Sequence, residues 1–92
     1  MAVTVKIPTQ LRAMTGGAAE TAGEGATVGE VLESVYAEHG SELRDRLTGD
    51  DGALRRFVNV YLAGEDIRFL DGLQTPVPDG SELTILPAVA GG

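Results

Sequence analysis

One amphipathic helix, predicted at residues 27–40, constrains the fold of this chain more than any other feature. Thr27 followed three residues later by Glu30 is the capping-box pattern that marks the start of a helix. Apolar side chains then recur at helical spacing along one face: Val28, Val31, Leu32, Val35 and Tyr36. A helix with a single apolar stripe has to cover another layer, so the rest of the chain must supply that layer.

Short alternating segments are predicted to supply it as a sheet. Apolar and polar residues alternate at 2–7, 56–63 and 81–86, which is typical of strands with one buried face. The inward side chains are expected to be Val3, Val5, Ile7, Val58, Val60, Leu62, Leu83 and Ile85. Residues 66–70 are expected to form a short strand and 41–47 a short helix, whereas the composition of 18–25 leaves a further strand open.

The order of these elements predicts an α+β fold. The 92 residues suffice for one domain, with a mixed four- to five-stranded sheet and the main helix packed across one face. The first and last strands are expected to lie side by side at the centre, because their alternation is the strongest. We expect residues 1–86 to form this domain and residues 87–92 to form a flexible C-terminal tail.

The charge and the missing residue types exclude several classes of function. A formal net charge of -7 argues against binding to nucleic acid or an anionic membrane, both of which need clustered basic residues. The charge suits docking to a partner with a positive face, or solubility alone. The chain has no cysteine, and neither a signal peptide nor a run long enough to cross a bilayer is evident. We therefore expect a cytoplasmic protein that is monomeric when free.

No catalytic or metal-binding constellation stands out in the sequence. His39, the only histidine, falls in the last turn of the predicted helix, where its charge favours the helix dipole. Asp50 and Asp51 fall in a polar loop that lacks the ligand spacing of a calcium loop. Arg55 and Arg56 are either a docking contact or the solvated start of a strand. We therefore expect no metal site and no bound cofactor in this chain.

The chain ends in "ILPAVAGG", a segment without any charged side chain. After Pro87 it contains only small residues and Val89, whereas disordered termini are usually polar. Glycine lets a backbone approach another surface closely, and Gly91 and Gly92 leave the terminal carbonyl unshielded. The Gly92 carboxylate is therefore the candidate site of chemistry.

The whole chain resembles the ThiS/MoaD-type sulfur carrier proteins, which have the ubiquitin-like β-grasp fold. The resemblance rests on "AVTVKIP", "TVGEVLESV", "RFVNVYLAGEDIRFLDGLQTPVPDG" and "SELTILPAVAGG". The segment "FVNVYLAGEDIRF" and the tail are most similar to the CysO-type carriers of the cysteine-biosynthesis branch in actinobacteria. Residues 14–26 contribute least to the resemblance.

The resemblance implies that this chain is a protein cosubstrate rather than an enzyme. An E1-like enzyme would use ATP to adenylate the carboxylate of Gly92, and sulfur would then replace one oxygen to give a thiocarboxylate. In the cysteine branch, the thiocarboxylate delivers sulfur to an aminoacrylate on a PLP-dependent cysteine synthase. A zinc metallopeptidase then releases cysteine and regenerates the Gly-Gly end. ATP, PLP and zinc would all belong to these partners.

Two groups of residues would contact the partners. Gly91 would give the terminus reach and narrowness, and the residues before it, Ala88, Val89 and Ala90, would line a partner's channel. The outer face of the sheet, with Phe57, Asn59 and Tyr61, is the candidate docking surface. Aromatic residues also occupy strands simply because they pack well there.

Three functions fit the same ending. The first is sulfur transfer for cysteine biosynthesis, with thiamin, molybdopterin or another metabolite as alternative destinations of the sulfur. The second is a ubiquitin-like modifier that is conjugated to lysines of other proteins through Gly92. The third is a β-grasp interaction domain whose tail is inert. The first two use the same activated end, so they share Gly92 as the reacting residue.

Overall fold

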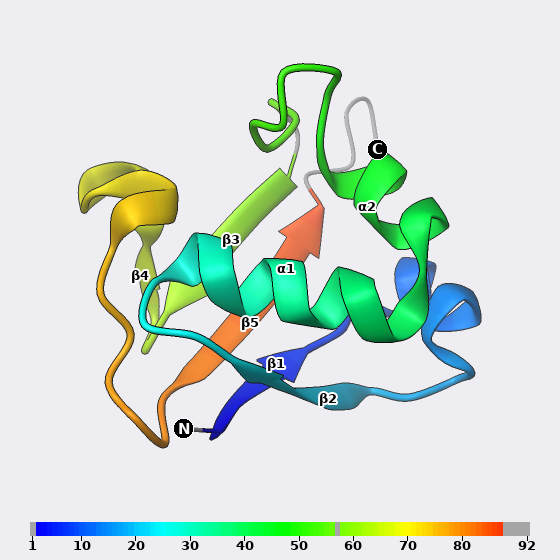
Figure 1. The fold of residues 1–92 in the computed structure, drawn as a ribbon, viewed down its shortest axis with the longest axis horizontal. Coiled ribbons are helices and arrows are strands. Elements are labelled where there is room, and N and C mark those ends of the chain that lie inside the picture. Colours follow the sequence, from blue (N-terminus) through cyan, green and yellow to red (C-terminus); the bar gives the residue numbers. More distant parts are fainter. Residues whose placement is uncertain (1, 57, 88–92) are drawn as a thin grey trace.

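The computed structural model describes residues 2–56 and 58–87. Over these residues the chain forms a mixed sheet, two α-helices and short 3-10 helices (Figure 1). In chain order the elements are β1 (Ala2–Lys6), η1 (Thr9–Thr15), β2 (Glu20–Glu24), α1 (Val28–His39), α2 (Ser41–Leu47), β3 (Val58–Leu62), β4 (Glu65–Asp66), η2 (Ile67–Phe69), η3 (Gly72–Gln74) and β5 (Glu82–Pro87).

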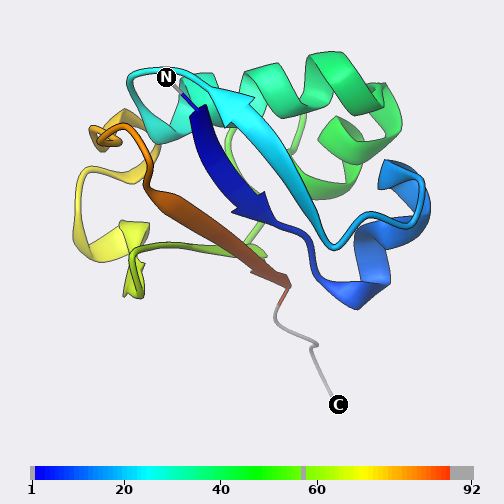
Figure 2. The ribbon, with the colours of Figure 1, turned by 90° about the horizontal axis from the view of Figure 1, so that it is seen from below.

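The sheet has five strands in the order β2-β1-β5-β3-β4. β1 and β5 pair in parallel, as the prediction of adjacent first and last strands requires, and the remaining pairs are antiparallel. Figure 2 shows α1 and α2 on one side of the sheet, so that the other face is left uncovered by helices. This arrangement is the ubiquitin-like β-grasp fold.

The core lies between α1 and the sheet. The inward side chains predicted for β1, β3 and β5 are buried, except for Leu62, which is half-buried. The predicted helix face is at most 4% exposed at every position: Val28, Val31, Leu32, Val35 and Tyr36. Full burial of one such side chain contributes about 1.5–3 kcal/mol. The contact between α1 and the sheet therefore holds the two layers together.

The start of α1 confirms the predicted capping residue. The backbone N–H of Glu30 donates to Thr27 Oγ1 at 3.3 Å. The Glu30 carboxylate reaches back to the N–H of Ala26 at 2.8 Å, one residue before the position that a capping box normally uses. Both bonds satisfy donors at the N-terminal end of the chain's main helix, where an acidic side chain also favours the helix dipole.

The structure contains a strand, β2, in the region that the sequence left open. A glycine explains why its composition is poor for a strand. Gly23 lies opposite Val3 in the register with β1 and faces α1. A Cβ atom on Gly23 would lie 2.7 Å from Val31 Cγ1 and 3.2 Å from Val35 Cγ2. The edge strand can therefore approach the helix only because it has no side chain at this position.

Two predicted strands have different bounds in the structure. The expected strand at 66–70 is wrong, because β4 ends at Asp66 and residues 67–69 form η2. The Asp66 carboxylate accepts the N–H of Arg68 at 2.9 Å, a local bond that competes with strand pairing. β5 continues one residue further than predicted, because Pro87 lies opposite Val58 in the sheet.

The close approach at Gly23 leads to a stability prediction. Gly23→Ala is expected to lower the free energy of unfolding by about 1–3 kcal/mol, because the added methyl group overpacks Val31. Ala22→Ser, at the exposed neighbouring position, is the matched control and should change stability by less than about 0.5 kcal/mol. Urea unfolding monitored by circular dichroism measures both. Equal or greater stability of the alanine variant would contradict the packing argument.

Candidate functional site

The candidate site begins where β5 leaves the sheet. β5 is paired on both sides, with β1 along one edge and β3 along the other. Its inward side chains, Leu83 and Ile85, are fully buried, and Leu86 and Pro87 lie opposite Asn59 and Val58. The chain that follows residue 87 therefore starts from a fixed point beside the first residue of β3.

Most of the predicted site residues lie outside the described part of the chain. These are Ala88, Val89, Ala90, Gly91, Gly92 and, on the candidate docking surface, Phe57. Of the predicted docking residues the structure describes Asn59 and Tyr61. Both are half-buried on β3, where they alternate with the buried Val58 and Val60 and thus belong to the outer face.

Arg68 ties this outer face to the start of β3. Its guanidinium donates from Nη1 to Asn59 Oδ1 at 2.9 Å and from Nη2 to the carbonyl oxygens of Arg56 and Val58, both at 2.8 Å. β4 pairs only with Tyr61 and Leu62. Arg68 therefore satisfies carbonyls on the part of β3 that β4 does not reach.

Sequence reasoning missed an apolar patch beside Asn59. Phe69 is 85% exposed and Leu86 is 47% exposed. Leu86 lies opposite Asn59 in the sheet, and Phe69 follows the arginine that holds Asn59. We call Tyr61, Phe69 and Leu86 the apolar patch. The signal that could have revealed Phe69 is the aspartate at position 66, because its side-chain turn ends the strand before the aromatic residue.

The polar groups considered as catalytic candidates have structural partners. His39 Nε2 is hydrogen-bonded to Thr21 Oγ1 at 2.9 Å, so the histidine joins the end of α1 to β2. The Asp51 carboxylate accepts the N–H of Ala53 at 3.0 Å within its loop. Arg55 donates to the carbonyl oxygen of Asp45. Within residues 2–56 and 58–87 there is no group of three or more potential metal-binding side chains.

Tyr36 is the one described group that combines burial with a clearly shifted pKa. It is 4% exposed and lines a cavity of about 390 Å³ between α1, η3 and the loop after α2. Its hydroxyl has no hydrogen-bond partner among the described residues. Burial, helped by the charge of Glu33, raises the pKa of Tyr36 to about 12, although Arg44 opposes the shift. The phenol in the folded protein therefore keeps its proton to a higher pH than an exposed tyrosine does.

None of the helices in the described residues is both long enough and apolar enough to span a membrane.

Comparison with known proteins places this geometry in a family. Residues 5–92 match the ThiS family. The chain therefore belongs to the ThiS family, whose match extends through the Gly-Gly end.

The similar proteins include sulfur carriers named CysO and a small archaeal modifier protein. The sulfur carrier protein CysO of Mycobacterium tuberculosis is 48% identical over 94 residues, with 100% of both chains covered. A chain of the crystal structure of the Amycolatopsis orientalis BexX/CysO complex has 50% identity and a TM-score of 0.91, covering 99% of this chain and 100% of that one. Small archaeal modifier protein 3 of Haloferax volcanii is 43% identical over 67 residues, which cover 73% of this chain and 71% of the relative.

The shifted Tyr36 predicts a pH dependence of stability. The folded-state pKa of about 12 lies above the ordinary value of 10.0. Between these values the unfolded chain loses the phenol proton first, so the free energy of unfolding falls as the pH rises from about 10 to about 12. Tyr36→Phe should remove this fall. At neutral pH it should leave stability unchanged or raise it by up to about 1 kcal/mol, because an unpartnered buried hydroxyl is lost.

Urea unfolding tests this from pH about 8, where the phenol is protonated in both states, to pH about 11, which lies inside the range where the stability falls. Tyr61→Phe is the matched control, because it alters the chain's other tyrosine and leaves the burial of Tyr36 intact. A Tyr36→Phe variant that loses alkaline stability as steeply as the wild type would overturn the assignment.

Proposed function

We propose that this chain is a sulfur carrier whose Gly92 carboxylate is converted to a thiocarboxylate that donates sulfur, with cysteine biosynthesis as its pathway. The observation that supports this most is the similarity to CysO, which covers the full length of both chains at 48% identity. The described structure supplies what such a carrier needs, a rigid domain whose last strand delivers the tail at a fixed position.

The chemistry requires an external activator. A carboxylate is a poor electrophile, and adenylation by an E1-like enzyme supplies a leaving group: the Gly92 carboxylate attacks the α-phosphate of ATP and releases pyrophosphate. A sulfide-equivalent nucleophile then adds to the acyl-adenylate and displaces AMP, which leaves a thiocarboxylate on Gly92. This chain acts only as the substrate of these steps, so it needs no base, metal or pocket of its own.

The acceptor chemistry belongs to further partners. In the cysteine pathway the thiocarboxylate sulfur attacks an aminoacrylate held by a PLP-dependent cysteine synthase, and a zinc metallopeptidase then cleaves the resulting adduct. Gly91 and the small residues Ala88, Val89 and Ala90 give the tail a narrow profile for these channels. Thiamin, molybdopterin or another metabolite is the alternative destination of the sulfur.

A second function is supported by a separate similarity. Small archaeal modifier protein 3 shares 43% identity with 67 residues of this chain. A modifier would form an isopeptide bond between Gly92 and a lysine of another protein. Recovery of cellular conjugates that carry such a bond would favour this function over sulfur transfer.

We further propose that partners dock on the outer face of the sheet through Phe57, Asn59 and Tyr61. The exposed Phe69 and Leu86 extend this surface, and exposed apolar residues gathered at one place are typical of interaction sites. The apolar patch lies beside the strand end from which the tail departs, so a partner that receives the tail would also meet the patch.

Extension of the C-terminus tests the proposed chemistry. Wild-type protein isolated from its own cells should show, by intact mass spectrometry, the mass increase that corresponds to exchange of one oxygen for sulfur. A variant with one alanine added after Gly92 should show none while it remains folded, because the reacting carboxylate is displaced. One alanine added before Met1 is the matched control and should leave the modification intact. A wild-type chain without sulfur in these cells would contradict the proposal.

Truncation of the apolar patch tests the docking face. Leu86→Ser should weaken binding to Amycolatopsis orientalis BexX, whose complex with CysO is known, by about 10-fold. Ala37→Ser, at an exposed position on α1 across the sheet from the patch, is the control and should leave affinity nearly unchanged. Isothermal titration calorimetry measures both. Equal affinities for both variants would rule out this face as the docking surface.

A further inference from the structure

The basic residues gather at the end of the sheet where β5 finishes. The chain has seven of them: Lys6, Arg12, Arg44, Arg46, Arg55, Arg56 and Arg68. Lys6 is the last residue of β1, which runs parallel to β5, and Arg12 lies on η1, which follows β1. The others belong to α2, to the segment before β3, or to η2.

Four of these arginines lie on segments that meet near Pro87, namely the end of α2, the segment before β3 and η2. The N–H of Arg55 donates to the Leu47 carbonyl at 2.9 Å, which places the end of α2 against the segment before β3. The Arg68 guanidinium contacts the carbonyls of Arg56 and Val58, and Val58 lies opposite Pro87. We call Arg46, Arg55, Arg56 and Arg68 the arginine cluster.

Among the described residues, the guanidinium groups of Arg55 and Arg68 donate to neutral oxygen atoms and not to carboxylates. The Arg55 guanidinium donates to the backbone carbonyl of Asp45, and Arg68 donates to two backbone carbonyls and an amide oxygen. Such bonds orient a guanidinium without neutralising it. Arg46 and Arg56 are exposed and form no ion pair with another described residue.

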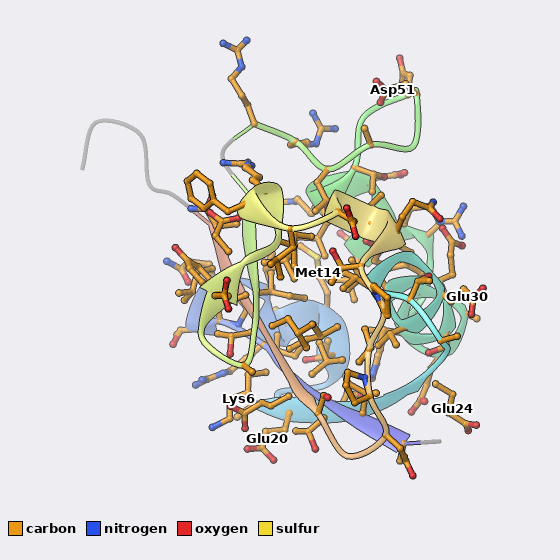
Figure 3. All side chains as sticks on the ribbon, turned by 90° about the vertical axis from the view of Figure 1, so that its left-hand side faces the viewer. Lys6, Met14, Glu20, Glu24, Glu30 and Asp51 are labelled. Carbon is orange, nitrogen blue, oxygen red and sulfur yellow. The ribbon has the colours of Figure 1, made fainter. Side chains whose placement is uncertain are left out.

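Of the basic residues outside the arginine cluster, Lys6 and Arg44 pair with carboxylates. Arg12 instead donates to the Ile7 carbonyl at 3.1 Å and lies on η1, away from the segment before β3 in the sequence. Lys6 lies 3.7 Å from carboxylates of both Glu20 and Glu82, and Figure 3 shows Lys6 and Glu20 side by side. Arg44 pairs with Glu33. The carboxylates of Asp45, Asp50 and Asp51 offset part of the positive charge near the cluster, and Asp51 lies at the tip of its loop (Figure 3).

The opposite end of the molecule is acidic. β2 and β3 run antiparallel to their central neighbours, so Glu24 and β4 lie at the end where β1 and β5 begin. The start of α1 joins them, because the N–H of Val77 donates to the Ala26 carbonyl at 2.9 Å. The segments at this end, 24–30, 65–66 and 75–82, contain no lysine or arginine. Their acidic residues are Glu24, Glu30, Glu65, Asp66, Asp79 and Glu82, of which Glu82 pairs with Lys6.

We infer that the arginine cluster docks against an acidic protein surface surrounding the channel of the partner enzyme that receives the tail. This inference rests on the proposed function and names the chemistry of that partner's surface. An uneven charge distribution orients a protein as it approaches a charged partner. The acidic end contains no basic residue, whereas the rest of the chain carries all seven basic residues and offsets most of its own acidic ones. An acidic surface therefore repels the acidic end and meets the exposed arginines at the end from which the tail departs.

The reach of the tail favours a protein surface over a bound nucleotide as the partner of the cluster. Five residues follow Pro87, and an extended chain of that length spans at most about 17 Å. When the tail is inserted, the arginine cluster stays near the mouth of the channel while Gly92 reaches the reaction centre. Electrostatic attraction between exposed groups falls off over about 8 Å at physiological ionic strength, so the cluster acts on the rim.

Single charge changes at the two ends of the molecule test the inference in cells. Arg56→Gln and Pro78→Glu each make the net charge of -7 one unit more negative, and both positions are exposed. Arg56 belongs to the cluster, whereas Pro78 lies at the acidic end beside Glu24 and Asp79. Arg56→Gln should lower the rate at which newly made protein gains sulfur about three- to ten-fold, and Pro78→Glu should leave it unchanged. Pulse labelling followed by intact mass spectrometry measures the rate.

Salt dependence in vitro provides the second test. Binding of the wild type to BexX should weaken as sodium chloride is raised, and the Arg56→Gln variant should bind more weakly at low salt and respond less to added salt. Equal rates in cells for Arg56→Gln and the wild type, while the wild type gains sulfur, would overturn the inference and leave the proposed function standing. Equal losses in both variants would also overturn it, since net charge alone would then explain them. A wild type that never gains sulfur would overturn both proposals.

Discussion

The parallel pairing of the first strand with the last is the constraint on which the rest of the structure depends. β5 completes the centre of the sheet, so the fold cannot close until the last strand has been added between β1 and β3. This pairing joins the two ends of the sequence, and such long-range contacts are costly in chain entropy. The same pairing fixes the point at which the tail leaves the domain. The pairing that completes the sheet therefore also positions the start of the tail.

The side chains that stabilise the domain are separate from the terminal carboxylate that is proposed to react. Its interior is built from aliphatic side chains between α1 and the sheet, together with Tyr36, whose pKa is raised to about 12 mainly by burial. A carrier benefits from this separation, because a partner enzyme can handle the terminal carboxylate without disturbing groups that stabilise the domain.

The sequence predicted the parts of the fold that depend on periodicity. The helix face, the inward residues of β1 and β5, and the capping pair Thr27 and Glu30 follow from local spacing, and the structure has them as expected. The formation of β2 and the end of β4 depend on contacts that periodicity does not reveal. Gly23 makes β2 possible through its approach to Val31, although glycine disfavours strands locally. Asp66 ends β4 through a side-chain turn, and this exposes Phe69, which a strand would have placed differently. The predicted tail chemistry at Gly92 lies outside the described residues and stays a prediction.

Net charge alone is a poor guide to the partner of a polarised molecule. A value of -7 suits a partner with a positive face or solubility alone, but that sum hides an acidic end without any basic residue and seven basic residues elsewhere. The residues around the departing tail include the arginine cluster, interspersed with the acidic residues Glu42, Asp45, Asp50 and Asp51. The acidic residues at the other end repel acidic surfaces, so a reversed orientation is disfavoured. Under the proposed docking mode, an acidic rim on a partner enzyme would suffice to receive the end that carries the tail first.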